Sequence, residues 1–118
     1  LCQVSTTLYN AALLADLKIT KRSPHSLPVH YVPLGLDATV STGVQTLSFV
    51  NNTQNYILIK SKTDSRNITF DILGVPLEGK TVKVYSKIIS NNTADAYKDI
   101  YMDGNLVKHE FLGRSKYK

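Results

Sequence analysis

The only cysteine of the chain lies at position 2, at the start of a run of residues that is typical of a helix. One cysteine cannot form an internal disulfide, so its role is packing, intermolecular pairing or reactivity. A thiol attacks as the thiolate, and the free N–H groups and partial positive charge at a helix N-terminus lower the pKa of a cysteine there. The backbone amides from Cys2 and Gln3 onward are also suited to stabilise an oxyanion. Cys2 is therefore the first catalytic candidate, and ordinary packing is the alternative.

A catalytic thiol needs an imidazole that takes its proton and a third group that orients the ring. Two histidines fit this role: His25 in a proline-bounded loop, and His30 in a segment that we expect to form a short strand. Asp37 follows both and is the candidate for the orienting carboxylate. His109 alternates with apolar residues in the expected last hairpin, so we interpret it as structural. The residue pattern leaves both His25 and His30 open as the base.

Other chemistries find less support in the sequence. There is no Cys-x-x-Cys or His-Glu-x-x-His pattern of the kind that holds a metal, and the six glycines form no phosphate-binding fingerprint. The chain also carries no RNA-binding aromatic strand motif, zinc finger or helix-turn-helix signature. We therefore expect no cofactor, no metal and no nucleic-acid partner.

The hydrophobic pattern predicts the elements that would position these residues. From Val4 to Asp16 the apolar residues recur at helical spacing and leave little polar face, which predicts a buried helix. Prolines between Lys18 and Val40 predict short extended pieces there. Beyond Gly43 the hydrophobic period becomes two, which predicts half-buried strands. The alternating positions are Leu47 and Phe49, Ile57 and Ile59, Ile68, Phe70 and Ile72, and Val82, Val84 and Ile88.

Together these elements predict an α+β fold, with one buried N-terminal helix packed on a mainly antiparallel β-sheet of about five to six strands. A last hairpin is expected through Asp103 and Gly104, a dipeptide that tolerates the positive φ angles of tight turns. The basic tail from Gly113 to Lys118 is expected to fray. With 118 residues, of which 42% are hydrophobic, residues 1–118 are expected to form a single domain.

The charge of the chain favours polyanionic surroundings. Fourteen Lys and Arg against nine Asp and Glu give a formal net charge of +5. Nucleic acid, anionic lipid and an acidic cell wall all carry the opposite charge, and a solvated basic face without a partner is the alternative. No segment approaches the roughly 18 consecutive apolar residues of a membrane span.

Three ordered blocks of the sequence resemble the VanW family of bacterial cell-envelope proteins, first associated with some glycopeptide-resistance clusters. The blocks are CQVSTTLYNAALLADLKI, KRSPHSLPVHYVPLGLDATV and LSFVNNTQNYILI, within residues 1–59. The resemblance implies that the chain is the C-terminal portion of the family domain, without its upstream part. Where the family commonly has an arginine before Asp-Ala-Thr-Val, this chain has Leu36, so a guanidinium that would stiffen this loop or bind a carboxylate is expected to be absent.

The resemblance also implies an activity and its residues. VanW domains act in some proteins as L,D-transpeptidases that build 3-3 cross-links in peptidoglycan, with a cysteine nucleophile that falls here on Cys2. The family histidine falls on His25, which favours it over His30 as the base, and the family aspartate falls on Asp37. We expect the substrate to be bound by Gln3, Ser5, Thr6, Ser26, His30 and Tyr31.

Under this interpretation the substrates are peptidoglycan stem peptides, and anionic wall polymers are a second class of partner. The resemblance implies an extracytoplasmic location in the bacterial envelope, with membrane contact only through segments upstream of this chain. The alternative is a non-catalytic envelope module that binds peptidoglycan, in which Cys2 only packs at the start of the helix.

Overall fold

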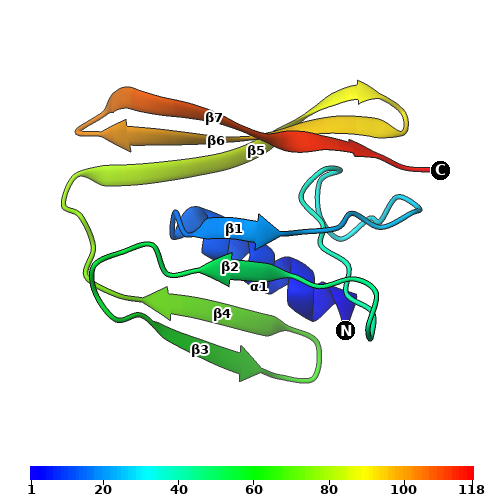
Figure 1. Cartoon of the computed structure of the whole chain (residues 1–118), viewed down its shortest axis with the longest axis horizontal. Helices are drawn as coiled ribbons and strands as arrows, with labels where there is room; N and C mark the ends of the chain where they lie inside the picture. Colours follow the sequence, from blue (N-terminus) through cyan, green and yellow to red (C-terminus); the bar gives the residue numbers. More distant parts are fainter.

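The computed structural model describes all residues, 1–118, as one helix and seven strands (Figure 1). The helix α1 spans Cys2–Leu14, and the strands are β1 (Lys18–Lys21), β2 (Ser48–Val50), β3 (Leu58–Thr63), β4 (Ile68–Leu73), β5 (Lys80–Ser90), β6 (Thr93–Met102) and β7 (Asn105–Lys116). They form three separate antiparallel sheets: β1 with β2, β3 with β4, and β5–β6–β7. The predicted fold class is therefore wrong, because the protein is mostly β and no single sheet of five or six strands covers the helix.

Hydrophobic alternation located most of the strands but gave no information about which strands pair. The half-buried alternation predicted at Ile68, Phe70 and Ile72 is present in β4. Its only partner, β3, is exposed along its whole length. The predicted turn at Asp103 and Gly104 is also present, since both residues have positive φ. The wrong step was to join all of these strands into one sheet.

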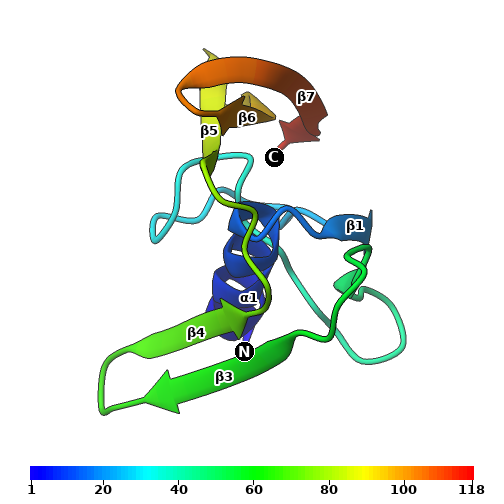
Figure 2. The same ribbon diagram turned by 90° about the vertical axis from the view of Figure 1, so that its left-hand side faces the viewer.

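Helix α1 lies between the three-stranded sheet and the β3–β4 hairpin (Figure 2). It ends at Leu14, and Asp16 then takes a positive φ of 58° that turns the chain into β1. Leu14 is 54% exposed, so the expectation of a helix buried all round is wrong. Helix α1, the one helix of the structure, does not have the length and apolar character needed to cross a membrane. The buried side of α1 consists of Ser5, Thr6, Tyr9, Ala12 and Leu13.

The main hydrophobic core joins α1 to the β5–β6–β7 sheet. Its fully buried members are Tyr9, Leu13, Leu36, Ala38 and Ala96, and the partly buried Ile19, Leu47, Val84 and Leu112 pack against them. The small residues Ala94 and Ala96 of β6 are fully buried in this region. Two of the five core members, Leu36 and Ala38, flank Asp37, so the core itself fixes the segment that carries this carboxylate.

Replacing Leu13 by alanine is expected to lower the free energy of unfolding by about 2–4 kcal/mol, because the truncation leaves a cavity in a fully buried position. Urea denaturation followed by circular dichroism measures the change. Leu14→Ala is the matched control: the same truncation one residue later, at an exposed position, is expected to change stability by less than about 0.5 kcal/mol. Equal losses for the two variants would contradict this assignment of the core.

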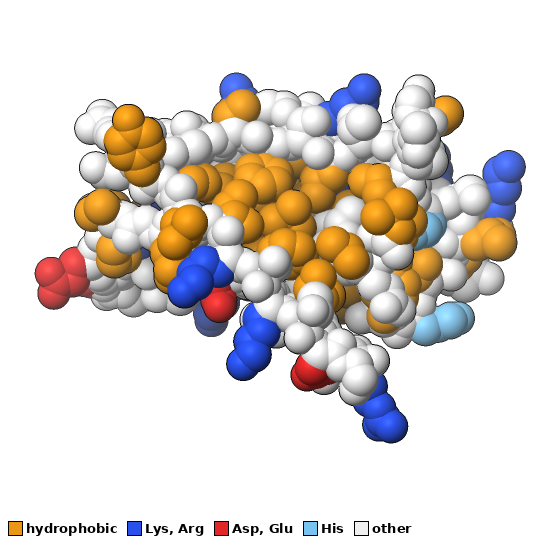
Figure 3. Space-filling view, turned by 90° about the horizontal axis from the view of Figure 1, so that it is seen from below, with side chains coloured by type: hydrophobic (Ala, Val, Ile, Leu, Met, Phe, Trp, Pro, Cys, Tyr) orange, Lys and Arg blue, Asp and Glu red, His pale blue; other side chains and the backbone are white.

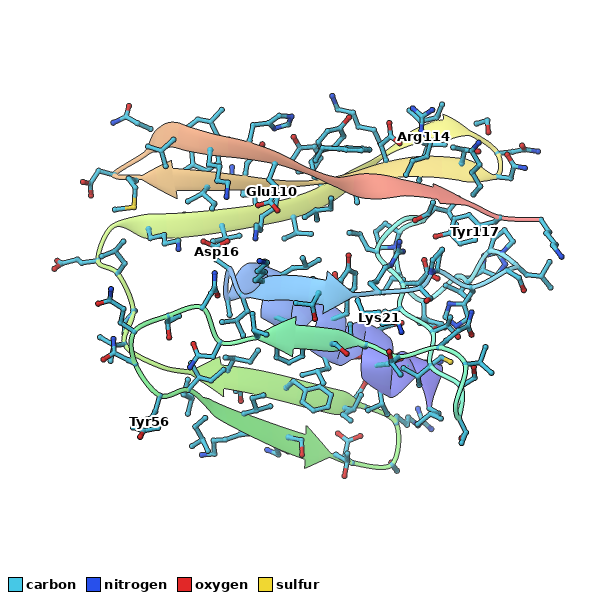
Figure 4. The ribbon with its side chains drawn as sticks, viewed as in Figure 1. Asp16, Lys21, Tyr56, Glu110, Arg114 and Tyr117 are labelled. Carbon is cyan, nitrogen blue, oxygen red and sulfur yellow. The ribbon has the colours of Figure 1, made fainter.

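A buried lysine ties the end of α1 to the sheet. Lys98 on β6 places its Nζ 2.6 Å from Asp16 Oδ1, and Lys80 on β5 places its Nζ 2.7 Å from Asp16 Oδ2. Burial alone would raise the pKa of Asp16, but the two lysines lower it on balance. Figure 4 shows Asp16 below β5, next to Glu110, whose carboxylate lies 3.5 Å from Lys98 Nζ. The buried ammonium is thus paired on both sides, as a buried charge requires.

The segment between β1 and β2 is irregular and passes through the interior. His30 lies in a bend, so the short strand expected there is absent. Residues 35–39 are all buried. Gly35 has a φ of +92°, and this left-handed backbone favours glycine, whereas a Cβ at this position would be in ordinary contact with the Cβ of Ala94 at 3.4 Å.

The basic tail does not fray as expected. Strand β7 runs to Lys116 and pairs with β6 as far as Thr93. Tyr117 is 3% exposed, and its backbone N–H donates to the Asn92 carbonyl at 2.8 Å. The N–H of Lys118 donates to the Ser26 carbonyl at 2.7 Å. Figure 4 shows Tyr117 near the end of the chain, next to the irregular segment.

Candidate active site

The thiol of Cys2 lies at the first residue of α1 and contacts the segment that follows Asp37. Its Sγ is 3.3 Å from Thr39 Oγ1 and 3.7 Å from the Val40 carbonyl oxygen. The contact with the Thr39 hydroxyl is the largest of the contributions that lower the pKa of Cys2 to about 7, followed by the contact with the Val40 backbone, against the opposing effect of burial. His25 adds a smaller lowering contribution. The helix N-terminus further favours the thiolate.

The imidazole of His25 is held by the carboxylate of Asp37. The backbone N–H of His25 donates to Asp37 Oδ2 at 2.8 Å, and His25 Nδ1 lies 2.6 Å from the same oxygen. An ionised carboxylate only accepts hydrogen bonds, so Nδ1 carries a proton, and in the neutral ring Nε2 is the unprotonated nitrogen. Burial alone would lower the pKa of His25, but Asp37 and then Cys2 raise it on balance. The neutral form of the ring is thus the tautomer that accepts a proton at Nε2.

The carboxylate of Asp37 is fully buried, and both of its oxygens are hydrogen-bonded. Oδ1 accepts a hydrogen bond from the hydroxyl of Tyr117 and a longer one, 3.3 Å, from Arg22. Burial would raise the pKa of Asp37, but the backbone N–H of His25, the Tyr117 hydroxyl, the His25 ring and Arg22 hold it below its usual value. Asp37 therefore stays ionised at neutral pH, despite its burial.

Arg22 supplies the guanidinium that the Leu36 position lacks. Its Nε donates to the Asp37 carbonyl at 2.7 Å and one terminal nitrogen donates to the Gly35 carbonyl at 3.1 Å. The other terminal nitrogen donates to Ser115 Oγ on β7 at 2.7 Å. The expectation that no guanidinium stiffens this loop is wrong, because Arg22 reaches it from the end of β1.

Ser5 and Thr6 use their hydroxyls to hold α1 against Ala38. Ser5 Oγ donates to the Ala38 carbonyl at 2.7 Å, and Thr6 Oγ1 both donates to that carbonyl at 3.1 Å and accepts from the Ala38 N–H at 3.0 Å. Both side chains are buried. Neither caps α1, whose N-cap is Leu1 without a side-chain hydrogen bond. These contacts fix Cys2 relative to Asp37.

The other predicted substrate-binding residues lie nearer the surface. Gln3, Ser26, His30 and Tyr31 are exposed. The Tyr31 hydroxyl is 3.5 Å from His25 Nε2, with the two rings edge-on. The structure therefore brings His25, and not His30, against Asp37, and it brings Tyr31 to the free nitrogen of the imidazole.

A small hollow of about 310 Å³ opens beside the imidazole. It is lined by His25, Ser26, Leu27, Pro28, Val29, Thr39 and Gln45. A larger groove, about 720 Å³, lies on the side of the β3–β4 hairpin, where hydrophobic side chains gather (Figure 3). That groove contains neither the thiol nor a histidine. The small hollow shares His25 and Thr39 with the candidate site, so it is the opening that lies next to the candidate catalytic residues.

Sequence reasoning missed Arg22, Thr39 and Tyr117 as parts of this site. Arg22 and Thr39 lie inside the quoted blocks, three residues before His25 and two residues after Asp37, so their proximity was a usable signal. Tyr117 is 80 residues from Asp37 and no local pattern indicates it. No three His, Cys, Asp or Glu side chains converge as metal ligands.

Alkylation of Cys2 by iodoacetamide is expected to be half-maximal near pH 7, because only the thiolate reacts. Thr39→Val removes the hydroxyl that contributes most to the low pKa. We expect this variant to raise the pKa by about one unit and to slow alkylation at pH 7 roughly five-fold. Thr42→Val, in the exposed part of the same loop, is the control. A pH profile that Thr39→Val leaves unchanged would contradict the assigned contact.

Comparison with known proteins places this site within a recognised sequence region. A family model described as "VanW like protein" matches residues 1–73. The chain is also 48% identical over 62 residues to the "Uncharacterized protein YoaR" of Bacillus subtilis (strain 168), a match that covers 52% of this chain and 20% of that protein. The matched part thus spans about a fifth of the relative's length. No solved structure matches the chain.

Proposed function

Since this chain belongs to the VanW family, we propose that it is a cysteine acyltransferase of the L,D-transpeptidase type, which forms 3-3 cross-links in peptidoglycan. The observation that carries the proposal is the thiol of Cys2, with its lowered pKa, next to a His25–Asp37 pair. Peptidoglycan lies outside the cytoplasm, so the proposal includes a location in the bacterial cell envelope.

In the first half of the reaction, the thiolate of Cys2 attacks the carbonyl carbon of the third residue of a donor stem peptide. His25 Nε2 takes the thiol proton, and Asp37 holds the imidazolium that results. The C–N bond to the terminal D-alanine then breaks. The imidazolium gives its proton to the departing amine, so that D-alanine leaves and a thioester to Cys2 remains.

The negative charge of the tetrahedral intermediate would be stabilised at the start of α1. The first backbone hydrogen bond of the helix runs from the Ser5 N–H to the Leu1 carbonyl at 3.1 Å. The N–H groups of Cys2, Gln3 and Val4 therefore have no acceptor within the helix. Preorganised backbone donors of this kind stabilise an oxyanion without having to reorient.

In the second half, the side-chain amine of the third residue in a neighbouring stem attacks the thioester. His25 takes a proton from the amine and returns it to the sulfur, which restores the resting pair. A new amide bond forms as the thioester bond breaks. The hollow, with Ser26 and Gln45 as polar lining and Leu27 as apolar lining, supports binding of a short peptide end.

The test is direct capture of the acyl-enzyme. The chain is incubated with a stem tetrapeptide, and its intact mass and the released D-alanine are measured together. We expect one adduct per chain, with the mass of the tetrapeptide less D-alanine, and an equivalent amount of free D-alanine. A thiol that alkylates normally near pH 7 but never forms this adduct would contradict the proposal and favour the non-catalytic module.

A further inference from the structure

Tyr117, the buried residue that follows β7, supplies one of the groups that hold Asp37. Asp37 Oδ2 accepts both hydrogen bonds from His25, whereas Oδ1 faces the opposite side and accepts from Tyr117 and Arg22. The Tyr117 hydroxyl also accepts the N–H of Gly35 at 2.9 Å. Tyr117 thus bridges two points of the segment that presents Asp37, from outside the region that the family model matches.

We propose that Tyr117 is a positioning residue of this site: its hydroxyl fixes the Asp37 carboxylate so that Oδ2 faces His25 and keeps the proton on Nδ1. The effect on catalysis rests on the proposed function, whereas the effect on the carboxylate and the imidazole does not. The β5–β6–β7 sheet then completes the site through the last strand.

The geometry distinguishes this role from simple packing. The terminal torsion of a carboxylate has broad wells, so its orientation depends on hydrogen bonds to both oxygens. Without the Tyr117 hydroxyl, Oδ1 keeps only the 3.3 Å contact with Arg22. The Gly35 N–H would at the same time lose its acceptor. The carboxylate could then rotate and weaken its hold on His25.

The charged and titratable groups around Asp37 indicate how loss of the Tyr117 hydroxyl would change the pKa of the carboxyl group. His25 and Arg22 face the carboxylate directly, and the ring of Tyr9 lies under the guanidinium, 5.5 Å from its carbon. Arg22 would remain in a variant without the hydroxyl, so Asp37 is expected to stay ionised at pH 7. The hydroxyl lowers the pKa of Asp37, so its removal is expected to raise that pKa.

The experiment uses Tyr117→Phe and two kinds of measurement. Carbon-13 NMR follows the titration of the Asp37 carboxyl, and proton NMR follows the His25 Nδ1–H resonance. We expect the pKa of Asp37 to rise by about one unit and the Nδ1–H resonance to broaden through faster exchange. In the acylation assay we expect the rate to fall about ten-fold at an unchanged KM for the donor peptide.

Two controls separate the hydroxyl from general loss of structure. Tyr85→Phe removes a similar bond, from a tyrosine hydroxyl to Asp99 at 3.0 Å, in a His–Asp–Tyr group that has no thiol. It is expected to leave Asp37, His25 and acylation unchanged. Ser115→Ala removes the Arg22 contact on β7 without touching Asp37, and is expected to leave the Asp37 titration unchanged.

A second change at position 117 keeps the test decisive if Tyr117→Phe does not fold. Site-specific 3-fluorotyrosine at position 117 keeps the ring and makes the hydroxyl a stronger donor, so the pKa of Asp37 is expected to move down. An unchanged Asp37 titration in both variants, or the same shift in Ser115→Ala, would overturn the positioning role. Absence of acylation in the unmodified chain would instead refute the proposed function, and the NMR measurements would still decide the role of Tyr117.

Discussion

Cys2→Ser is expected to lower the rate of acylation by a stem tetrapeptide on the order of 10³-fold or more. The serine hydroxyl would occupy nearly the same place beside Thr39, but its proton is far less acidic than that of the thiol. His25 would then have to generate a much poorer nucleophile, while the hollow and the backbone donors of α1 stay in place. The measurements are adduct formation by intact mass and release of D-alanine at pH 7.

The composition of the chain makes this experiment clear to interpret. Cys2 is the only cysteine, so a thioester adduct can form at one position alone. The hydroxyls of Ser5 and Thr6 are held by the Ala38 backbone, which leaves them poorly placed to substitute for the thiol. Cys2→Ala, which also lacks the hydroxyl, should behave like Cys2→Ser. D-alanine release by either variant at the unmodified rate would place the nucleophile elsewhere.

The fold was predictable where the signal was local. The helix, the strand around Phe70 and the turn at Gly104 follow from hydrophobic period and turn chemistry, which act over a few residues. Sheet pairing is not local: β4 pairs only with β3, which is exposed along its whole length, and not with β2, whose Phe49 is half-buried. Strand β1 was predicted only as an extended piece of the proline-containing segment, and its sequence, Lys-Ile-Thr-Lys, has a single apolar residue and so no alternation to identify it as a strand.

The residues of the candidate site also fall into those that the sequence indicates and those that it does not. Cys2, His25 and Asp37 were named from residue type and from the resemblance. The structure joins His25 to Asp37 and places the imidazole near enough to Cys2 to lower the pKa of the thiol. Arg22 and Tyr117 were not named, because their contribution depends on where β1 ends and where β7 docks. A buried carboxylate needs partners for all its oxygens, so a prediction of Asp37 in the interior could have prompted a search for donors. That search had no local pattern by which to choose Tyr117.

Asp37→Asn is expected to lower the acylation rate roughly 10²–10⁴-fold while leaving the thiol in place. The carboxamide can turn its N–H₂ group toward His25, which would move the imidazole proton to Nε2, the nitrogen that must accept the proton from Cys2. The substitution also removes the carboxylate that raises the pKa of His25. Steady-state acylation and a proton-detected titration of His25 measure the two effects.

A double variant determines whether Asp37 acts through the imidazole. If it does, adding Asp37→Asn to a His25→Ala chain should cause little further loss, since the orienting group has no ring left to orient. If Asp37→Asn lowered the acylation rate of the His25→Ala chain as much as that of the unmodified chain, Asp37 would act mainly by stabilising the fold and not by orienting the imidazole. Asp71→Asn, an exposed change on β4, is the matched control for the charge removed.

Acid denaturation separates the structural part of the Asp37 effect. The folded-state pKa of Asp37 lies below its ordinary value, so its ionised form contributes stability that is present above the unfolded pKa, about 4. That contribution is lost as the pH falls through the folded-state pKa. Asp37→Asn lacks this group, so its stability should fall less steeply over the same acidic range. At pH 7 the variant should be less stable than the unmodified chain, because the Tyr117 hydroxyl and Arg22 lose a charged acceptor. A decrease in the acylation rate that remains after correction for the folded fraction then reports the effect of Asp37 on the imidazole.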